Sequence, residues 1–96
     1  MVSTEEIKNK LKEVIDPEIG YDIISLGEIE DIKIENNKVK IVFLPTTPLC
    51  PFIPMILSGI EEKIRELNLE ADIEIDFKNI WSLDRVDPEI RRKLGL

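Results

Sequence analysis

The feature that most constrains the fold is a change in apolar spacing on either side of residues 44–51, whose sequence is Leu-Pro-Thr-Thr-Pro-Leu-Cys-Pro. Before this stretch, apolar residues alternate as in a strand with one buried face, at Val39, Ile41 and Phe43. After it, they recur at helical spacing, at Ile53, Ile56, Leu57, Ile60, Ile64 and Leu67. The stretch is therefore predicted to join a strand to a helix that begins at Pro51 or Pro54.

The only cysteine of the chain, Cys50, lies in this stretch. A position within about one turn of a helix N-terminus places it near free backbone N–H groups, which favour a thiolate. Two prolines flank it, and Thr46 and Thr47 precede it. Those threonines suit hydrogen bonds to a bound group, or helix capping. We interpret Cys50 as a functional thiol; the alternative is an inert, buried small side chain.

The N-terminal half predicts a helix and a hairpin. Residues 3–6 have the sequence of a capping box, so a first helix should begin there and end before Pro17. Alternation over residues 32–35, two asparagines and the strand at 39–44 predict a β-hairpin. Ile29 is out of phase with that alternation, which indicates a bulge.

The C-terminal half predicts a strand and a short helix. The helix after residues 44–51 should end near Leu67, because Asn68 suits a helix stop. A last strand follows, with apolar positions at Ala71, Ile73, Ile75 and Phe77. Asp87 and Pro88 fit the N-cap and first position of a closing helix.

These elements predict an α+β fold. Each strand has one apolar and one charged face, so the helices should cover only one side of the sheet. The expected architecture is a two-layer α/β sandwich in the order α-β-β-α-β, with a short C-terminal helix and a mixed three-stranded sheet. A right-handed crossover makes the last strand parallel to the one before it. We expect a single domain over residues 1–96.

Charge and composition exclude several classes of function. Thirteen basic against twenty acidic residues leave a net charge of −7, which disfavours nucleic acid and anionic membranes as partners. Without an apolar membrane span or a signal-peptide pattern, the chain is expected to be soluble and cytoplasmic. The absence of histidine removes a Cys–His dyad. Many charged residues and no glutamine are typical of proteins from hyperthermophiles.

Two carboxylates form the second candidate for chemistry. Asp16 and Glu18 lie in the sequence Asp-Pro-Glu-Ile-Gly, which suits a plain turn, hard metal ligands or a base beside a thiolate. If both long helices cover the same sheet face, the loop leaving the first reaches the start of the second. We therefore expect Asp16 or Glu18 to lie near the sulfur of Cys50, where a carboxylate raises the thiol pKa that a helix terminus lowers.

Three further residues are candidates for partner binding. Trp81 is the only tryptophan, and it suits either a lid over the helix start or an exposed anchor. Arg91 and Arg92 suit either a partner's carboxylate or the C-terminal end of their own helix.

Taken in order, these motifs resemble the SufT/PaaD-type domain over almost the whole chain. The matching segments are 16–20, Leu26-Gly27, 46–51, Trp81 and the closing sequence Arg-Arg-Lys-Leu-Gly-Leu at 91–96. Two positions depart from the family pattern. Glu28 stands where an apolar residue is usual, and Asn79-Ile80 precede Trp81 where prolines are common.

The resemblance implies a factor for iron–sulfur cluster assembly or maturation that works on apo-protein clients. It implies a functional cluster of Asp16, Glu18, Thr46, Thr47 and Cys50, with Cys50 as a metal ligand. Because clusters usually need four thiolates, no cluster should be held stably by a monomer. A transient cluster would bridge two chains in a homodimer, or be completed by an assembly or client protein or a small thiol.

Two other classes of function compete with this interpretation. A thiol transferase or hydrolase would use Cys50 as nucleophile and Asp16 or Glu18 as base, since histidine is absent. A structural adaptor would dock a partner on the charged sheet face. The sequence favours a non-enzymatic role.

Overall fold

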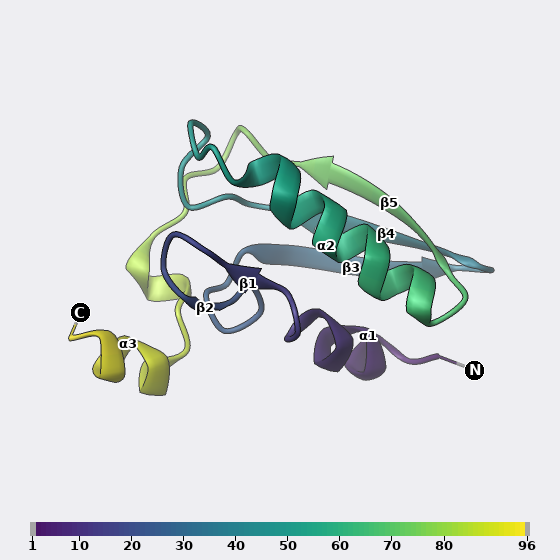
Figure 1. Cartoon of the computed structure of the whole chain (residues 1–96), viewed down its shortest axis with the longest axis horizontal. Helices are drawn as coiled ribbons and strands as arrows, with labels where there is room; N and C mark the ends of the chain where they lie inside the picture. The colour runs from purple at the N-terminus through teal and green to yellow at the C-terminus, as the bar shows by residue number, and fades with distance from the viewer. Residues whose placement is uncertain (1, 96) are drawn as a thin grey trace.

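Two helices and a three-stranded sheet form the two layers of the molecule (Figure 1). The computed structural model describes residues 2–95, so Leu96 of the closing motif lies outside the described residues. The helices are α1 (Thr4–Leu11), α2 (Ile53–Glu66) and α3 (Pro88–Leu94), with a 3₁₀ turn η1 (Leu83–Arg85). The strands are β1 (Ile15–Asp16), β2 (Tyr21–Asp22), β3 (Ile29–Glu35), β4 (Lys38–Phe43) and β5 (Glu70–Ile75).

The topology of the larger sheet confirms the predicted one. Its strand order is β3-β4-β5, with β4 antiparallel to β3 and parallel to β5. Asn36, in the hairpin turn, has a φ of 57°, and the predicted bulge lies between Ile29 and Asp31. Asn68 has a φ of 61° just beyond α2, which fits its predicted role as a helix stop.

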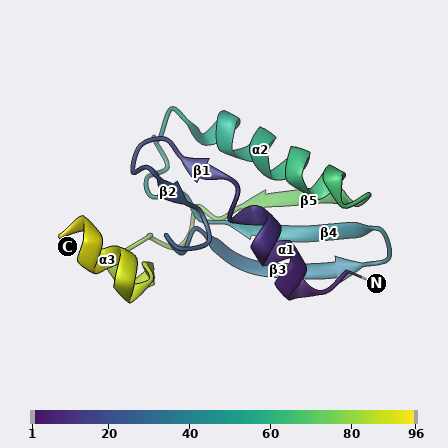
Figure 2. The same cartoon turned by 60° about the horizontal axis from the view of Figure 1, so that its bottom comes forward.

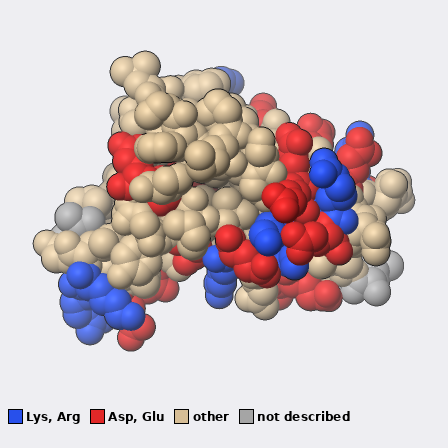
Figure 3. Space-filling view, viewed as in Figure 1, with Lys and Arg blue, Asp and Glu red and all other residues tan. Residues whose placement is uncertain are grey.

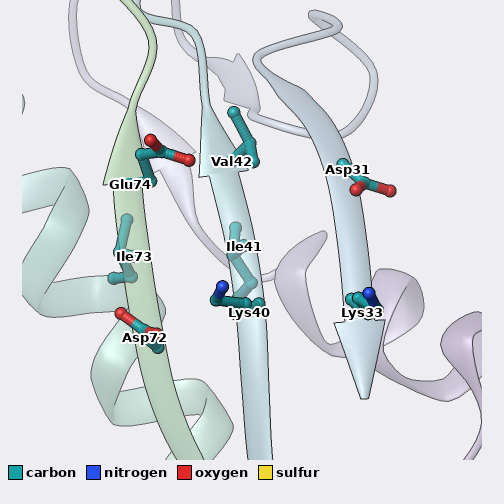
Figure 4. A pocket seen from close by; sticks show the side chains of 8 residues that line it. All are labelled: Asp31, Lys33, Lys40, Ile41, Val42, Asp72, Ile73 and Glu74. Carbon is teal, nitrogen blue, oxygen red and sulfur yellow. The ribbon is translucent and has the colours of Figure 1, made fainter. Parts of the chain in front are cut away.

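The core lies between the central strand and the two long helices. Val39, Ile41 and Phe43 of β4 are fully buried against α1 and α2, whose buried positions include Ile7, Leu11, Ile56, Ile60 and Ile64. Figure 2 shows both helices on the same face of the sheet. The other face carries charged side chains, including Lys33, Lys40 and Asp72 (Figure 4). This face is a shallow, solvated sheet surface. Within residues 2–95, no helix is long and apolar enough to cross a bilayer.

One pair of short strands was not predicted, and the expected end of the last strand is wrong. The first helix ends at Leu11, and Ile15–Asp16 pairs with Tyr21–Asp22 in a small antiparallel sheet that the sequence patterns missed. The last strand ends at Ile75, and Phe77 is 66% exposed. Asp76 turns the chain there, because its side chain accepts the backbone N–H groups of Lys78 and Asn79.

The segment 81–87 forms a strap across the turn at residues 25–28. The Trp81 indole Nε1–H donates to the Leu26 carbonyl over 2.6 Å, and Arg85 Nε donates to the Gly27 carbonyl over 2.7 Å. The Asp87 backbone N–H donates to the Ser25 carbonyl over 2.8 Å. These bonds tie the start of the C-terminal segment to the turn that precedes β3.

Candidate functional site

A tight turn places Cys50 just before α2. The Cys50 N–H donates to the Thr47 carbonyl over 3.1 Å, and Thr47 Oγ1 accepts the Leu49 N–H over 3.3 Å. The helix begins at Ile53, with Pro54 in its first turn, where the missing N–H has no consequence. Cys50 is 6% exposed, so its sulfur lies at the bottom of the turn rather than on an open surface.

The loop after β1 brings Glu18 to this sulfur, from 32 residues away in the sequence. The Cys50 thiol donates to Glu18 Oε2 over 3.0 Å, while the Glu18 residue itself is exposed. Burial first, and then the Glu18 contact, raise the pKa of the Cys50 thiol, although the Phe52 N–H lowers it. The raising effects win, so Cys50 carries its proton at neutral pH.

Asp16 lies behind this contact and organises the loop. Its Oδ1 accepts the Glu18 backbone N–H over 2.9 Å, and its carbonyl accepts the Gly20 N–H over 2.7 Å. Asp16 is fully buried, and its Oδ2 has no hydrogen-bond partner among the described residues. The structure thus assigns different positions to the two predicted carboxylates: Glu18 contacts the sulfur, and Asp16 shapes the turn that presents Glu18.

The prediction missed a third carboxyl group, that of Glu28. Its side chain is 1% exposed, and neither of its oxygens has a hydrogen-bond partner among the described residues. Burial first, and then the negative charge of Asp16, raise the pKa of Glu28 to about 9. The sequence signal was a glutamate after Leu26-Gly27, at a position where the resemblance led us to expect an apolar residue.

The other predicted residues belong to the turn, to a groove beside it and to α3. Thr47 forms the turn, and Thr46 and Trp81 line a small groove of about 90 Å³ beside it. Arg91 and Arg92 belong to α3, where Arg91 pairs with Asp84 over 3.7 Å. Figure 3 shows the basic side chains of α3 gathered apart from the rest of the positive charge. The arginines therefore form a separate surface and do not join Cys50.

Exposed apolar side chains surround the turn that holds Cys50. Leu49 is 88% exposed, Ile80 is 89% exposed, and Met55 and Phe77 are also largely exposed. Phe77 and Ile80 line the groove together with Pro48, which precedes Leu49. We call Leu49, Met55, Phe77 and Ile80 the apolar rim. Figure 3 shows uncharged surface over the region where the loop before α2 lies. Apolar surface of this kind marks sites of protein interaction.

Few potential metal ligands gather at Cys50. Within residues 2–95, no three or more Cys, Asp or Glu side chains are arranged as a metal site. Cys50 offers one sulfur with an adjacent carboxylate. This arrangement suits a ligand that is shared with another molecule, and a proton acceptor next to it.

Replacement of Glu18 by glutamine should make Cys50 more reactive. The carboxylate charge helps to raise the thiol pKa, so Glu18→Gln should lower that pKa and speed alkylation of Cys50 at neutral pH by roughly threefold to tenfold. The measurement is the rate of iodoacetamide reaction against pH. An unchanged rate in Glu18→Gln would show that the carboxylate has no influence on the thiol.

The chain is similar to known proteins in sequence and in fold. A family model described as iron–sulfur cluster assembly protein matches residues 4–77. The Fe-S protein maturation auxiliary factor YitW of Bacillus subtilis is 26% identical over 95 residues, which cover 96% of this chain and 93% of that protein. The auxiliary factor SufT of Staphylococcus aureus is 31% identical over 70 residues, covering 72% and 77%. A solved structure, a conserved hypothetical protein from Thermotoga maritima, is similar with a TM-score of 0.86, 41% identity and coverage of 99% and 96%.

Proposed function

This chain belongs to the iron–sulfur cluster assembly protein family, and we propose that it acts as a maturation factor that offers Cys50 as a temporary ligand to iron or a cluster bound for a client protein. The observation that carries this proposal is the contact between the Cys50 thiol and Glu18, inside the apolar rim. The names of the similar maturation factors support the process, and the contact supports the way in which this chain takes part.

The contact accounts for how a protonated thiol becomes a ligand. Metal binding requires the thiolate, so the proton must leave as the metal arrives. Glu18 Oε2 lies 3.0 Å from the sulfur, within the range for direct proton transfer, and the exposed Glu18 residue passes the proton to water. Until metal arrives, the raised pKa of Cys50 keeps the sulfur protonated and protects it from oxidation.

A client or assembly protein completes the ligand set in this proposal. Four thiolates usually hold a cluster, and this chain supplies one. The apolar rim, which includes Leu49 next to Cys50 in the sequence, gives a client a surface to dock on. The arginines of α3 offer a second contact, to acidic groups of a partner. A homodimer that joins two Cys50 residues is the alternative source of a second thiolate.

A thiol transferase is the less favoured function. Such an enzyme needs an activated thiolate at neutral pH, whereas burial and Glu18 raise the pKa of Cys50. A structural adaptor would use the charged sheet face and not the sulfur, so the test must separate these two features.

Cys50→Ser should abolish the contribution of the chain to cluster transfer. The experiment is anaerobic incubation of the protein with ferrous iron and sulfide, followed by addition of an apo-ferredoxin and measurement of its cluster absorbance over time. The wild type and the control Ser58→Ala, which changes an exposed side chain on α2, should speed formation of the ferredoxin cluster. Cys50→Ser should match the reaction without the chain.

Three results would change the assignment. If Cys50→Ser transfers clusters as fast as the wild type, the adaptor function is supported and the ligand role of Cys50 is wrong. Turnover of a thioester without metal would support the transferase. Cluster absorbance that elutes with a dimer on gel filtration would show that two copies of the chain share the cluster.

A further inference from the structure

We propose that Glu28 is a positioning residue for the Cys50 site: its protonated carboxyl donates a hydrogen bond to Asp16 and thereby fixes the loop that carries Glu18. The inference concerns the same site as the proposed function. It rests on that function only in taking Cys50 to be a temporary ligand.

The backbone around Glu28 directs its side chain inward. The Glu28 N–H donates to the Ile23 carbonyl over 3.0 Å, and its own carbonyl accepts the Leu44 N–H over 2.6 Å. Gly27, just before it, has a φ of 70° and is tied to Arg85 by the strap. With the main chain held on both sides, the Glu28 carboxyl has no route to solvent, which agrees with its 1% exposure.

The oxygens of Asp16 and Glu28 need a proton between them. Asp16 Oδ2 and both Glu28 oxygens are buried and have no hydrogen-bond partner among residues 2–95. Among residues 2–95, none of the ion pairs involves Asp16, Glu18 or Glu28. The two carboxyl groups lie within reach of a hydrogen bond to each other. Two buried carboxylates so placed, without counter-charge, would be very unfavourable. One proton on Glu28 removes a charge and supplies an O–H donor for Asp16.

The raised pKa of Glu28 supports this assignment. Burial, and then the charge of Asp16, raise that pKa to about 9, so Glu28 is the carboxyl that is protonated at neutral pH. The Thr46 backbone lowers this pKa and the negative charge of Glu18 raises it, and the raising effects win.

Hydrogen bonds then lead from Glu28 to the sulfur. When Asp16 Oδ2 accepts the Glu28 proton, Asp16 Oδ1 remains free to accept the Glu18 backbone N–H, at 2.9 Å. That bond sets the turn in which Glu18 reaches the Cys50 thiol, at 3.0 Å. Without the donor, Asp16 must find another partner, and the loop no longer holds Glu18 against the sulfur. The thiol then loses one of the two influences that raise its pKa most.

The test compares Glu28→Gln with Glu28→Leu, because glutamine keeps an N–H donor for Asp16 and leucine does not. The readout is the pH profile of Cys50 alkylation by iodoacetamide. Glu28→Leu should react roughly threefold to tenfold faster at neutral pH, because the thiol pKa is lower and more thiolate is present. Glu28→Gln and the control Ile64→Val, a core change at the other end of α2, should keep the wild-type profile. The double variant Glu18→Gln/Glu28→Leu should react no faster than Glu18→Gln.

A second measurement detects the proton of Glu28 in the wild type and does not depend on the folding of Glu28→Leu. The infrared spectrum of the wild type at neutral pH should contain the C=O band of a protonated carboxyl, and Glu28→Gln should lack it. The proposal is overturned if this band is absent from the wild type, if Glu28→Leu keeps the wild-type profile, if Glu28→Gln matches Glu28→Leu, or if the two effects in the double variant add. Neither measurement uses iron, sulfide or a client, so its outcome is independent of the cluster-transfer experiment.

Discussion

The free energy of unfolding should fall as the pH rises from 4.5 to about 9, and Glu28→Gln should remove most of that fall. The pKa of Glu28 is about 9 in the folded chain and 4.5 as an ordinary glutamate. Between these values the folded chain keeps a proton that the unfolded chain has lost, so each rise in pH favours unfolding. One proton corresponds to a slope of up to about 1.4 kcal/mol per pH unit. The total change is therefore on the order of 6 kcal/mol across the window.

One other group acts in this window: burial and the contact with Asp76 also raise the pKa of Glu30, by less than that of Glu28. The remaining shifted groups act outside it. Hydrogen bonds from Asn79 and Lys78 hold the pKa of Asp76 far below its usual value, so its contribution is lost only in acid. The raised pKa of Cys50 starts from 9.0 and affects stability only in more alkaline solution. Glu28 should therefore dominate the pH dependence from 4.5 to about 9.

Urea unfolding followed by circular dichroism at about pH 5, 7 and 9 measures the slope. Glu61→Gln, a change at an exposed glutamate of α2, is the matched control and should keep the wild-type slope. A wild-type stability that is as flat with pH as that of Glu28→Gln would show that Glu28 titrates normally.

Gly27→Ala should destabilise the chain by roughly 2–5 kcal/mol, from a left-handed backbone penalty of about 1–2 and an overpacking penalty of about 1–3. Gly27 has a φ of 70°, and a Cβ there would overlap the Arg85 carbonyl oxygen and approach the Arg85 Cβ to 2.6 Å. The backbone of the strap would have to move away, with loss of its bond to the Gly27 carbonyl. Thermal and urea unfolding measure the change.

Gly20→Ala is the natural control for this variant. Gly20 also has a positive φ, 87°, but nothing lies within 4 Å of a Cβ added there. It should show the backbone penalty alone, about 1–2 kcal/mol. Equal losses of unfolding free energy in the two variants would show that a Cβ at Gly27 does not clash with Arg85 of the strap.

Local patterns determined the helices and the three strands of the larger sheet, the buried sheet face and the parallel crossover, but not the short β1–β2 pair. Alternation at Val39, Ile41 and Phe43 reports which side of β4 is buried, because side chains of a strand point to opposite faces in turn. Asn36 and Asn68 adopt a positive φ, which asparagine tolerates, so the hairpin turn and the end of α2 could be predicted from the sequence. The same reasoning wrongly placed Phe77 in the strand, because the apolar alternation in the sequence continues past Asp76, where the chain turns.

The tertiary structure alone decided how the candidate site is assembled. The sequence placed a carboxylate near Cys50 but could not choose between Asp16 and Glu18, since the choice depends on which side chain the β1–β2 turn directs at the sulfur. It identified Glu28 only as an unusual residue. The burial of Glu28 comes from backbone bonds to Ile23 and Leu44, and from the strap that holds Gly27 in place. A local pattern records periodicity along the chain, whereas the protonation of Glu28 and Cys50 depends on solvent exclusion and on charges that are distant in sequence.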